Sequence, residues 1–249
     1  MHTASSPYAA RPTPAMPLVP GGRWHQPLGV PKPVSPIAQG HGGLDVTRVV
    51  NLMGGRRKIS QGECVYRQRD PLNYIYAVQS GSFKSTLALS DGCEQVSDFH
   101  LTGALLGLDG VADGHHASTA TALEDSEVSM VSYAQLTDCA LTTAGMQLAL
   151  LRLISGEMIR VRIPLVLLGN RNARQRLAGF LLKHSESLNA LGYSATEFHL
   201  KMSRGDIGSF LGMTLETVSR TFSELQHMHL LKVVRRHIHI SDPQGLARL

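Results

Sequence analysis

Apolar residues recur at helical spacing in two neighbouring segments near the C-terminus. The first segment ends at Gly212, a residue that readily adopts the left-handed conformation that terminates helices. Ser203 and Asp206 stand at capping-box spacing before it, and Thr214 can cap the second segment. We therefore predict two short helices joined by a tight turn. Ile207, Phe210 and Leu211 form an apolar stripe on the first helix, and the predicted buried face of the second consists of Leu215, Val218, Phe222 and Leu225.

The other face of the second predicted helix is polar near its N-terminal end. In a helix-turn-helix, this end meets base edges in the DNA major groove. Arg220 can donate two hydrogen bonds to a guanine, and Glu216 can accept one from a cytosine amine. The alternative is an ordinary solvated helix face. We expect DNA contacts from Ser203, Arg204, Thr214, Glu216, Thr217, Ser219 and Arg220.

A hairpin and a preceding helix complete this predicted unit. Residues 230–240 form a strand-like run with Arg235 and Arg236 at its centre, where a hairpin tip would lie. A longer helix is predicted from about Ala173 to Leu191. The combination predicts a winged helix-turn-helix over residues 171–249.

The net charge is concentrated in the same segment. Residues 171–249 contain 11 Lys and Arg against 6 Asp and Glu, whereas residues 1–170 contain 13 of each, so the formal excess of +5 lies wholly in the C-terminal segment. Cationic side chains that neutralise phosphates release counterions and make DNA binding salt-dependent. Charge therefore supports the DNA-binding interpretation, although an ordinary solvated surface also carries modest excesses.

Strand-length runs replace the helical pattern between about Leu44 and Asp138. Glycines separate them, and Asp91-Gly92 is a strong hairpin signal. Several short strands with regular turn signals indicate an antiparallel barrel or jelly roll. The predicted strands lie at 63–67, 74–79, 82–89 and 94–101, with two more within 120–133.

A long helix is predicted from about residue 145 to 168. Its apolar residues are spaced three and four apart, as in the seam of a coiled coil, and none of the seam positions is acidic. We favour a parallel homodimer interface, because helix-turn-helix proteins usually pair to read two half-sites. The alternative is packing against the chain's own β-domain. The predicted seam residues are Leu151, Ile154, Met158, Val161, Leu165 and Leu168.

Composition narrows the class of protein. Residues 1–43 hold 9 of the 12 prolines without regular periodicity, which predicts a disordered tail. The chain lacks an apolar run of about 18–20 residues and a continuous signal-peptide core, so we expect a cytoplasmic protein without a membrane partner. Its three cysteines do not form a disulfide framework.

The order of these segments resembles the CRP/FNR regulators, and looks closest to the FNR branch. The resemblance covers about residues 55–248. It implies an α+β fold with an N-terminal antiparallel β-roll similar to cyclic-nucleotide-binding domains (44–144), a dimerisation helix (145–170) and a C-terminal winged helix-turn-helix (171–249). The similar motifs are Gln61-Gly62, Tyr76–Lys84, Gly107–Asp109, Gly114–His116, Arg204–Gly208 and Leu215–Arg220.

The resemblance implies a sequence-specific DNA-binding regulator that is not an enzyme. By the match of Leu215–Arg220, the residues Glu216, Ser219 and Arg220 would read a TTGAT half-site, with an inverted ATCAA partner bound by a second subunit. RNA polymerase is the implied partner. FNR-like proteins more often activate, through exposed loops of the β-roll, and promoter position decides between activation and repression.

Departures from the family pattern argue against the known cofactors. FNR holds an iron–sulfur cluster on four cysteines; this chain has only three cysteines, and Ser129 stands at the position that matches the fourth ligand. The cyclic AMP phosphate pocket resembles Gly-Glu-Leu-Gly and Arg-Ser-Ala. Here Gly103–Gly107 and Ala117-Ser118 lack the glutamate and the arginine. We therefore expect no cofactor.

Three modes of control stay open. The regulator can be constitutive, it can respond through the thiol of Cys64, Cys93 or Cys139, or it can bind haem or a metal at His115 and His116. Cys93 is the best thiol candidate because it follows a predicted turn. Adjacent histidines point in different directions on most backbones, which disfavours the metal.

A metalloenzyme of the cupin type is the rival class, because its fold is also a small β-barrel. Its ligands would include a His-x-His pair within the barrel. The pairs His227/His229 and His237/His239 both lie in the segment assigned to DNA instead. We accordingly predict no metal site and no catalytic residue.

Overall fold

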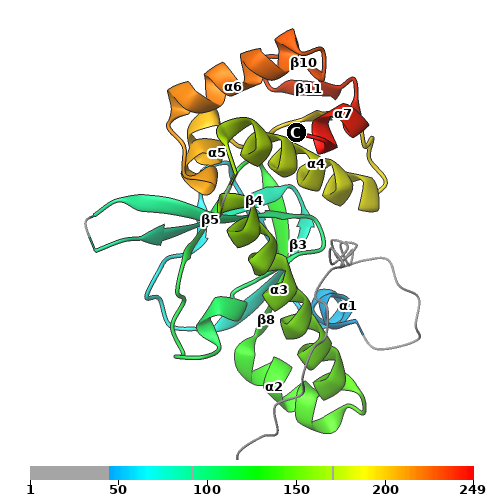
Figure 1. Ribbon diagram of the computed structural model, residues 1–249. Helices are drawn as coiled ribbons and strands as arrows, with labels where there is room; N and C mark the ends of the chain where they lie inside the picture. The colour runs from blue at the N-terminus through cyan, green and yellow to red at the C-terminus, as the bar shows by residue number, and fades with distance from the viewer. Residues whose placement is uncertain (1–44, 91, 170) are drawn as a thin grey trace, which may run out of the picture. The chain divides into compact units, whose positions relative to one another are not determined.

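The computed structural model describes residues 45–90, 92–169 and 171–249, without the side chains of residues 161–168. All of these belong to one compact unit, Pro33–Leu249. The segment 1–43, predicted to be a disordered tail, lies outside the described residues, as does Asp91 of the predicted hairpin turn. Figure 1 traces the chain through strands, then the long helix α3, then a smaller helical unit with its own hairpin.

Eight strands form the predicted β-roll. They make two four-stranded antiparallel sheets, ordered β1-β8-β3-β6 and β2-β7-β4-β5. Six of these strands fall on the predicted runs, whereas β1 and β6 were not predicted. Their bounds are β1 Gly55–Ile59, β2 Cys64–Tyr66, β3 Tyr74–Ser80, β4 Ser82–Ala88, β5 Glu94–Leu101, β6 Leu105–Leu106, β7 Thr119–Ala122 and β8 Ser126–Ser132.

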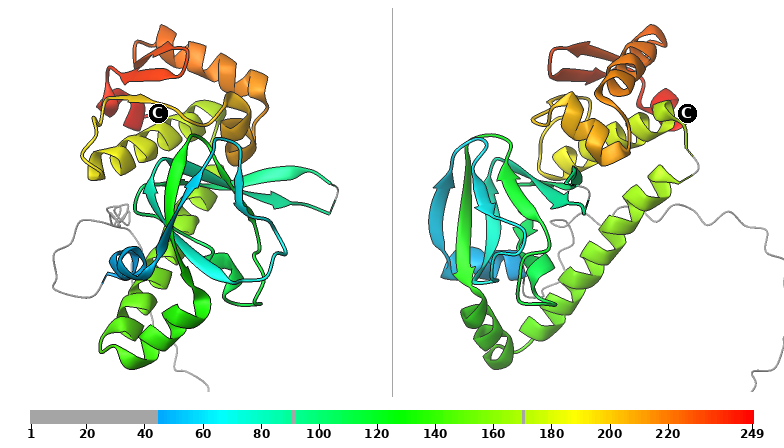
Figure 2. Two further views of the ribbon diagram at one scale, coloured as in Figure 1. Left: turned by 180° about the vertical axis from the view of Figure 1, so that it is seen from behind. Right: turned by 90° about the vertical axis from the view of Figure 1, so that its left-hand side faces the viewer.

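The two sheets face each other (Figure 2), and an apolar core lies between them. Phe83 of one sheet and Val128 of the other are fully buried in it. Alternation of inward and outward side chains along each strand produces this one-sided burial. A 3₁₀ turn, η1 Leu108–Gly110, follows β6.

Two helices that were not predicted from the sequence flank the β-roll: α1 Val46–Met53 and α2 Tyr133–Thr142. Asp45 caps α1 by accepting a hydrogen bond from the Thr47 amide at 2.9 Å. Ser132 and Gln135 form a capping box at the start of α2. The valines of α1 favour strand by propensity, which hides this short helix in the sequence.

Helix α3, Met146–Leu168, confirms the predicted long helix. One face packs on the β-roll through Met146 and Ala149, which are buried. The opposite face is open: Leu151, Ile154 and Met158 are 64%, 44% and 54% exposed. The side chains of the other predicted seam residues, Val161, Leu165 and Leu168, lie outside the described residues.

The C-terminal unit confirms the predicted winged helix-turn-helix. Its three-stranded sheet, ordered β10-β11-β9, is antiparallel and packs its apolar face on the helices. Strand β9 and helix α7 were not predicted. The bounds are α4 Ala173–Ala190, β9 Glu197–His199, α5 Arg204–Leu211, α6 Leu215–His227, β10 Leu231–Val234, β11 His237–Ile240 and α7 Pro243–Ala247.

The edge formed by β4 and β5 contacts the first helix of the helix-turn-helix. Phe99 of β5 packs against Phe180 and Phe210, with ring centroids 5.9 and 5.2 Å away. Lys84 Nζ donates to Asp206 Oδ1 at 2.5 Å. Aromatic packing on α4 and α5, together with an ion pair to α5, therefore joins the β-roll to these helices.

Among the described residues, no helix is long and apolar enough to span a bilayer.

Candidate nucleic-acid interface

The turn between α5 and α6 forms as its capping residues predict. Ser203 Oγ accepts from the Asp206 amide at 3.0 Å, and Asp206 Oδ2 accepts from the Ser203 amide at 2.8 Å. Gly212 ends α5 in the left-handed conformation, with φ 62°. Thr214 caps α6 by accepting from the Thr217 amide at 3.2 Å. Satisfied helix ends hold the start of α6 in a defined orientation.

A backbone contact fixes the tight turn that joins the two helices. A Cβ added at Gly208 would lie 2.6 Å from the Met213 carbonyl oxygen, closer than real Cβ contacts allow. The Met213 amide also donates to the Gly208 carbonyl at 2.8 Å. Only glycine fits at this position beside the turn.

The buried face of α6 matches the prediction except at its first position. Val218, Phe222 and Leu225 are 0–2% exposed, but Leu215 is 52% exposed, so its predicted burial is wrong. Leu215 is the first helical residue, and side chains of a helix lean towards the N-terminus. Its side chain therefore extends past the core that begins at Val218.

Polar side chains occupy the opposite face of α6. Glu216, Ser219 and Arg220 are exposed, and the Arg220 side chain retains 74% of its accessible surface. Hydrogen bonds from its own backbone amide and from the Thr214 hydroxyl hold the pKa of Glu216 below its usual range. This face thus presents an acceptor, a hydroxyl and a cation side by side, as base-edge recognition requires.

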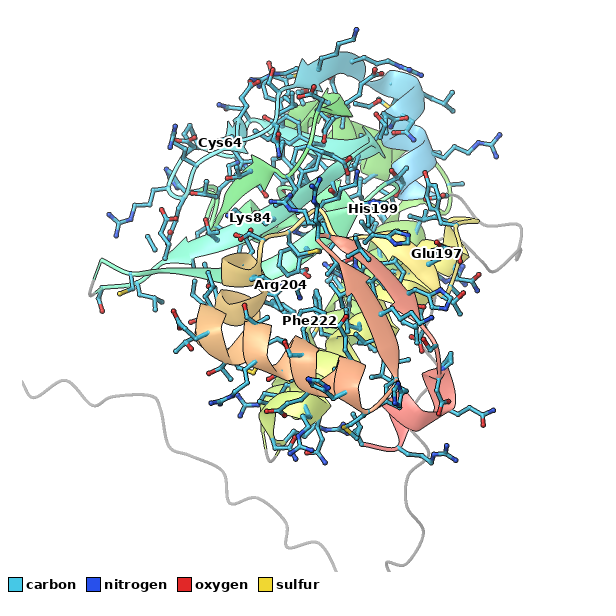
Figure 3. The ribbon with its side chains drawn as sticks, turned by 90° about the horizontal axis from the view of Figure 1, so that it is seen from above. Cys64, Lys84, Glu197, His199, Arg204 and Phe222 are labelled. Carbon is cyan, nitrogen blue, oxygen red and sulfur yellow. The ribbon has the colours of Figure 1, made fainter. Side chains whose placement is uncertain are left out.

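Arg204 is less exposed than the sequence suggested. Its guanidinium lies 3.3 Å from the centroid of the Phe222 ring, and Figure 3 shows the two residues meeting between α5 and α6. Burial lowers the pKa of Arg204 to about 10. Its buried Nη1 has no hydrogen-bond partner among the described atoms. Such a cation–π contact fixes the guanidinium plane.

The predicted wing is formed by β10 and β11. Arg235 and Arg236 occupy its tip, both exposed, and Arg235 adopts a positive φ of 58°. A hollow of about 350 Å³ lies between the tip and the start of α5. Three arginines surround an apolar floor there, which suits an anionic ligand such as a phosphate. The lining residues are Leu200, Met202, Ser203, Arg204, Gly205, Ile207, Leu215, Arg235 and Arg236.

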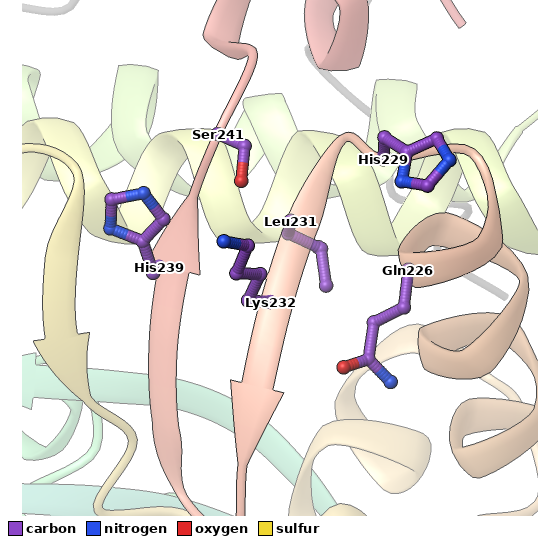
Figure 4. A pocket seen from close by; sticks show the side chains of 6 residues that line it. All are labelled: Gln226, His229, Leu231, Lys232, His239 and Ser241. Carbon is purple, nitrogen blue, oxygen red and sulfur yellow. The ribbon is translucent and has the colours of Figure 1, made fainter.

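A second hollow of about 530 Å³ lies at the base of the wing, beside the end of α6 (Figure 4). It brings His229 and His239, one from each predicted His-x-His pair, to the same surface, with Lys232 opposite His239 on the neighbouring strand. His237 instead contacts Glu197 at 3.1 Å. Within the described ranges, no group of three His, Cys, Asp or Glu side chains could hold a metal ion.

Two relevant residues escaped the sequence reasoning. Phe222 was assigned to the core alone, although it also supports Arg204. Glu224 was passed over, although its carboxylate contacts Arg174 of α4 at 3.0 Å and Arg220 at 3.9 Å. The spacing of four residues between Arg220 and Glu224 is the signal that could have found the second contact.

Comparison with known proteins identifies the family and its two domains. Residues 175–249 match the Crp-like helix-turn-helix domain, and residues 56–142 match the cyclic nucleotide-binding domain. The chain is 40% identical to the transcriptional regulatory protein Btr of Bordetella pertussis over 205 residues. This alignment covers 82% of this chain and 85% of Btr.

The chain belongs to the CRP/FNR family of transcriptional regulators.

Two further CRP/FNR proteins agree. The fumarate and nitrate reduction regulatory protein of Escherichia coli K12 is 36% identical over 205 residues, 82% of each chain. The solved structure of FixK2 from Bradyrhizobium japonicum superposes with a TM-score of 0.73 at 33% identity, covering 79% of this chain and 96% of FixK2. CRP/FNR proteins bind DNA through the helix-turn-helix and typically act as dimers, so this chain is a DNA-binding regulator rather than an enzyme.

Proposed function

We propose that this CRP/FNR regulator binds the palindrome TTGAT-N4-ATCAA as a homodimer, without an iron–sulfur cluster or cyclic AMP. The observation that carries the proposal is the exposed polar face of α6, where Glu216, Ser219 and Arg220 stand together on a helix held by Ser203 and Thr214. Arg220 reads the guanine of the half-site and Glu216 accepts from the paired cytosine.

The remaining predicted contacts position the helix on the DNA backbone. Ser203 and Arg204 border the hollow of about 350 Å³ at the start of α5, called the arginine-rich hollow below. Thr214 and Thr217 lie at the start of α6. Helix N-termini and hydroxyls commonly bind phosphate oxygens. We assign these four residues to phosphates, and Glu216, Ser219 and Arg220 to bases.

The open face of α3 supports the homodimer. Leu151, Ile154 and Met158 follow one line along the helix and would pair with the same residues of a second copy. A twofold dimer places two copies of α6 one helical turn of DNA apart, which a palindrome requires.

The residues at the position that resembles the cyclic AMP phosphate pocket do not fit a cyclic nucleotide. The amide and hydroxyl of Ser118 both donate to Asp109 Oδ2, at 2.9 and 2.7 Å. Burial raises the pKa of Asp109, but hydrogen bonds from His116 and Ser118 outweigh it and hold the pKa below its usual range. An ionised carboxylate on these donors would repel a phosphate.

The cysteines do not fit an iron–sulfur cluster. Cys64 is part of β2, Cys139 is part of α2, and Cys93 precedes β5. The hydroxyl of Ser129, at the position that resembles the fourth ligand, is buried and has no hydrogen-bond partner among the described atoms. Three thiolates, from three separate segments of the chain, leave the cluster one ligand short.

We further propose that the protein acts in the cytoplasm on RNA polymerase, as an activator or a dual regulator, without a membrane partner. The turn between β4 and β5 offers a contact surface for the polymerase, since Leu89 is 44% exposed beside it.

Cys93 is exposed at the same turn, which favours a thiol-responsive regulator as the second candidate. The haem alternative is weaker, because His116 is only 3% exposed and stacks on Tyr66 with ring centroids 3.7 Å apart.

A titration of the palindrome with protein purified in air, with and without thiol reductant, tests the proposal. Tight binding that is indifferent to reductant supports a cluster-free constitutive regulator. Binding only after reduction supports the thiol switch. If Arg220→Ala leaves affinity for the palindrome intact, the assignment of α6 to base recognition is wrong.

A further inference from the structure

The carboxylate of Glu224 stands between two arginines of different helices. Its Oε2 atom lies 3.0 Å from Nε of Arg174, near the start of α4, and its Oε1 atom lies 3.9 Å from Nε of Arg220. Each oxygen therefore faces one guanidinium. Because side chains of a helix lean towards its N-terminus, Glu224 leans over the turn that carries Arg220.

The two contacts differ in strength. The Arg174 contact has hydrogen-bond distance and ties the carboxylate to α4, whereas the Arg220 contact is beyond that distance and leaves the guanidinium free to move. The Glu224 side chain is 40% exposed and the Arg220 side chain 74% exposed. Arg174 thus anchors the carboxylate while Arg220 can exchange it for another partner.

We propose that Glu224 is a positioning residue that makes Arg220 selective for guanine over phosphate; this inference rests on the proposed function. In the free protein Glu224 gives Arg220 an anionic partner. If Arg220 exchanges Glu224 for a DNA phosphate, one anionic partner replaces another, so the exchange gains little binding free energy. A guanine instead accepts two directional hydrogen bonds from Arg220, and these offset the loss of the contact with Glu224.

The contact between Glu224 and Arg220 should affect the specificity of DNA binding more than its affinity for the palindrome. A competing intramolecular contact weakens wrong complexes more than the right one, which is how an interface gains discrimination. Removing the carboxylate should therefore strengthen binding to unrelated DNA more than binding to the palindrome. Surface ion pairs are weak, so we expect the ratio of the two affinities to fall roughly two- to fivefold.

The test measures the dissociation constants of the full chain for the palindrome and for a scrambled duplex at one salt concentration. Glu224→Gln is expected to lower the specificity ratio, and Glu224→Asp, which keeps the charge but shortens the reach, should lower it as well. Glu186→Gln removes the same charge from an exposed position of α4 and should leave the ratio unchanged. Urea unfolding of each variant shows that the fold is retained.

The Arg220→Ala background shows whether Glu224 acts through Arg220. There, Glu224→Gln should no longer change the specificity ratio. An unchanged ratio in the single variant, or a change that persists without Arg220, would overturn the positioning role and leave the proposed function standing. Should Arg220→Ala itself leave palindrome affinity intact, both the proposed function and this inference fail.

Discussion

The guanidinium carbon of Arg204 lies over the ring of Phe222, 3.3 Å from its centroid. One residue belongs to α5 and the other to α6, so the contact joins the two helices of the helix-turn-helix on the side that faces the arginine-rich hollow. A single aromatic ring thereby serves the core and the proposed phosphate contact together.

Replacing Phe222 by Leu tests this double role. The variant keeps an apolar side chain but removes the ring, which should cost about 1–3 kcal/mol of unfolding free energy from lost packing and the lost cation–π contact. Urea denaturation measures that cost. DNA affinity should fall several-fold for the palindrome and for scrambled DNA alike, because a phosphate contact carries no sequence information. A selective loss on the palindrome would contradict the assignment of Arg204.

Lysine at position 204 provides the companion measurement. Arg204→Lys keeps the charge but loses the planar group that stacks on Phe222. We expect a smaller loss of stability than in Phe222→Leu and a comparable loss of DNA affinity. Equal DNA binding by the variant and the parent would show that charge alone is sufficient at this position.

His184 should make stability depend on pH. Burial between Phe180 and Phe198 lowers the pKa of His184 to about 4, below its ordinary value of 6.5. The unfolded chain therefore binds a proton between these values that the folded chain does not, so stability is complete above about pH 6.5 and is lost as pH falls towards 4. The loss is on the order of 3 kcal/mol.

Urea titrations at pH 7 and pH 5 compare the parent with His184→Gln. The parent should lose more stability than the variant over this interval. A variant with the same pH dependence as the parent would assign the effect to other groups.

Asp206 should matter more to stability than its partner Lys84. Asp206 completes the capping box of α5 and also accepts from Lys84 of the β-roll. Asp206→Asn should cost about 1–2 kcal/mol of unfolding free energy, and Lys84→Gln less than about 1 kcal/mol because that pair is partly exposed. Thermal and urea unfolding measure both, and the opposite ranking would show that the ion pair outweighs the cap.

Charge on the open face of α3 should disrupt pairing. Ile154→Glu places a carboxylate where the proposed seam excludes water, and should raise the dimer dissociation constant by at least about tenfold. Gly156→Glu is the matched control, because a Cβ there meets no atom within 4 Å. Sedimentation velocity distinguishes the two. Unchanged association of Ile154→Glu would place the dimer interface elsewhere.

Elements with local signals were predictable from the sequence. Ser203, Gly212 and Thr214 act through neighbours three or four residues away, so their spacing alone predicts α5 and α6. The runs around β3, β4 and β5 likewise follow from alternation and turn residues. By contrast, α1 packs only because distant strands supply its partners, and its valines favour another conformation.

Contacts between distant residues explain what the sequence did not predict at the site. The stacking of Arg204 on Phe222 and the contact of Arg174 with Glu224 depend on how three helices cross. Leu215 illustrates the same limit, because periodicity assigns it to the apolar stripe whereas the core begins one turn later, at Val218. Helical spacing gives a face, and tertiary packing decides how far along the helix that face is covered.

The close approach of Gly208 to Met213 means that the angle at which α6 is presented is determined by main chain rather than by side-chain fit. The proposed recognition face of α6 can therefore acquire new side chains, and with them new target sequences, without a change in its orientation. A single methyl group at Gly208 would have the opposite effect, because it would tilt α6 without changing any of the side chains that we assign to DNA.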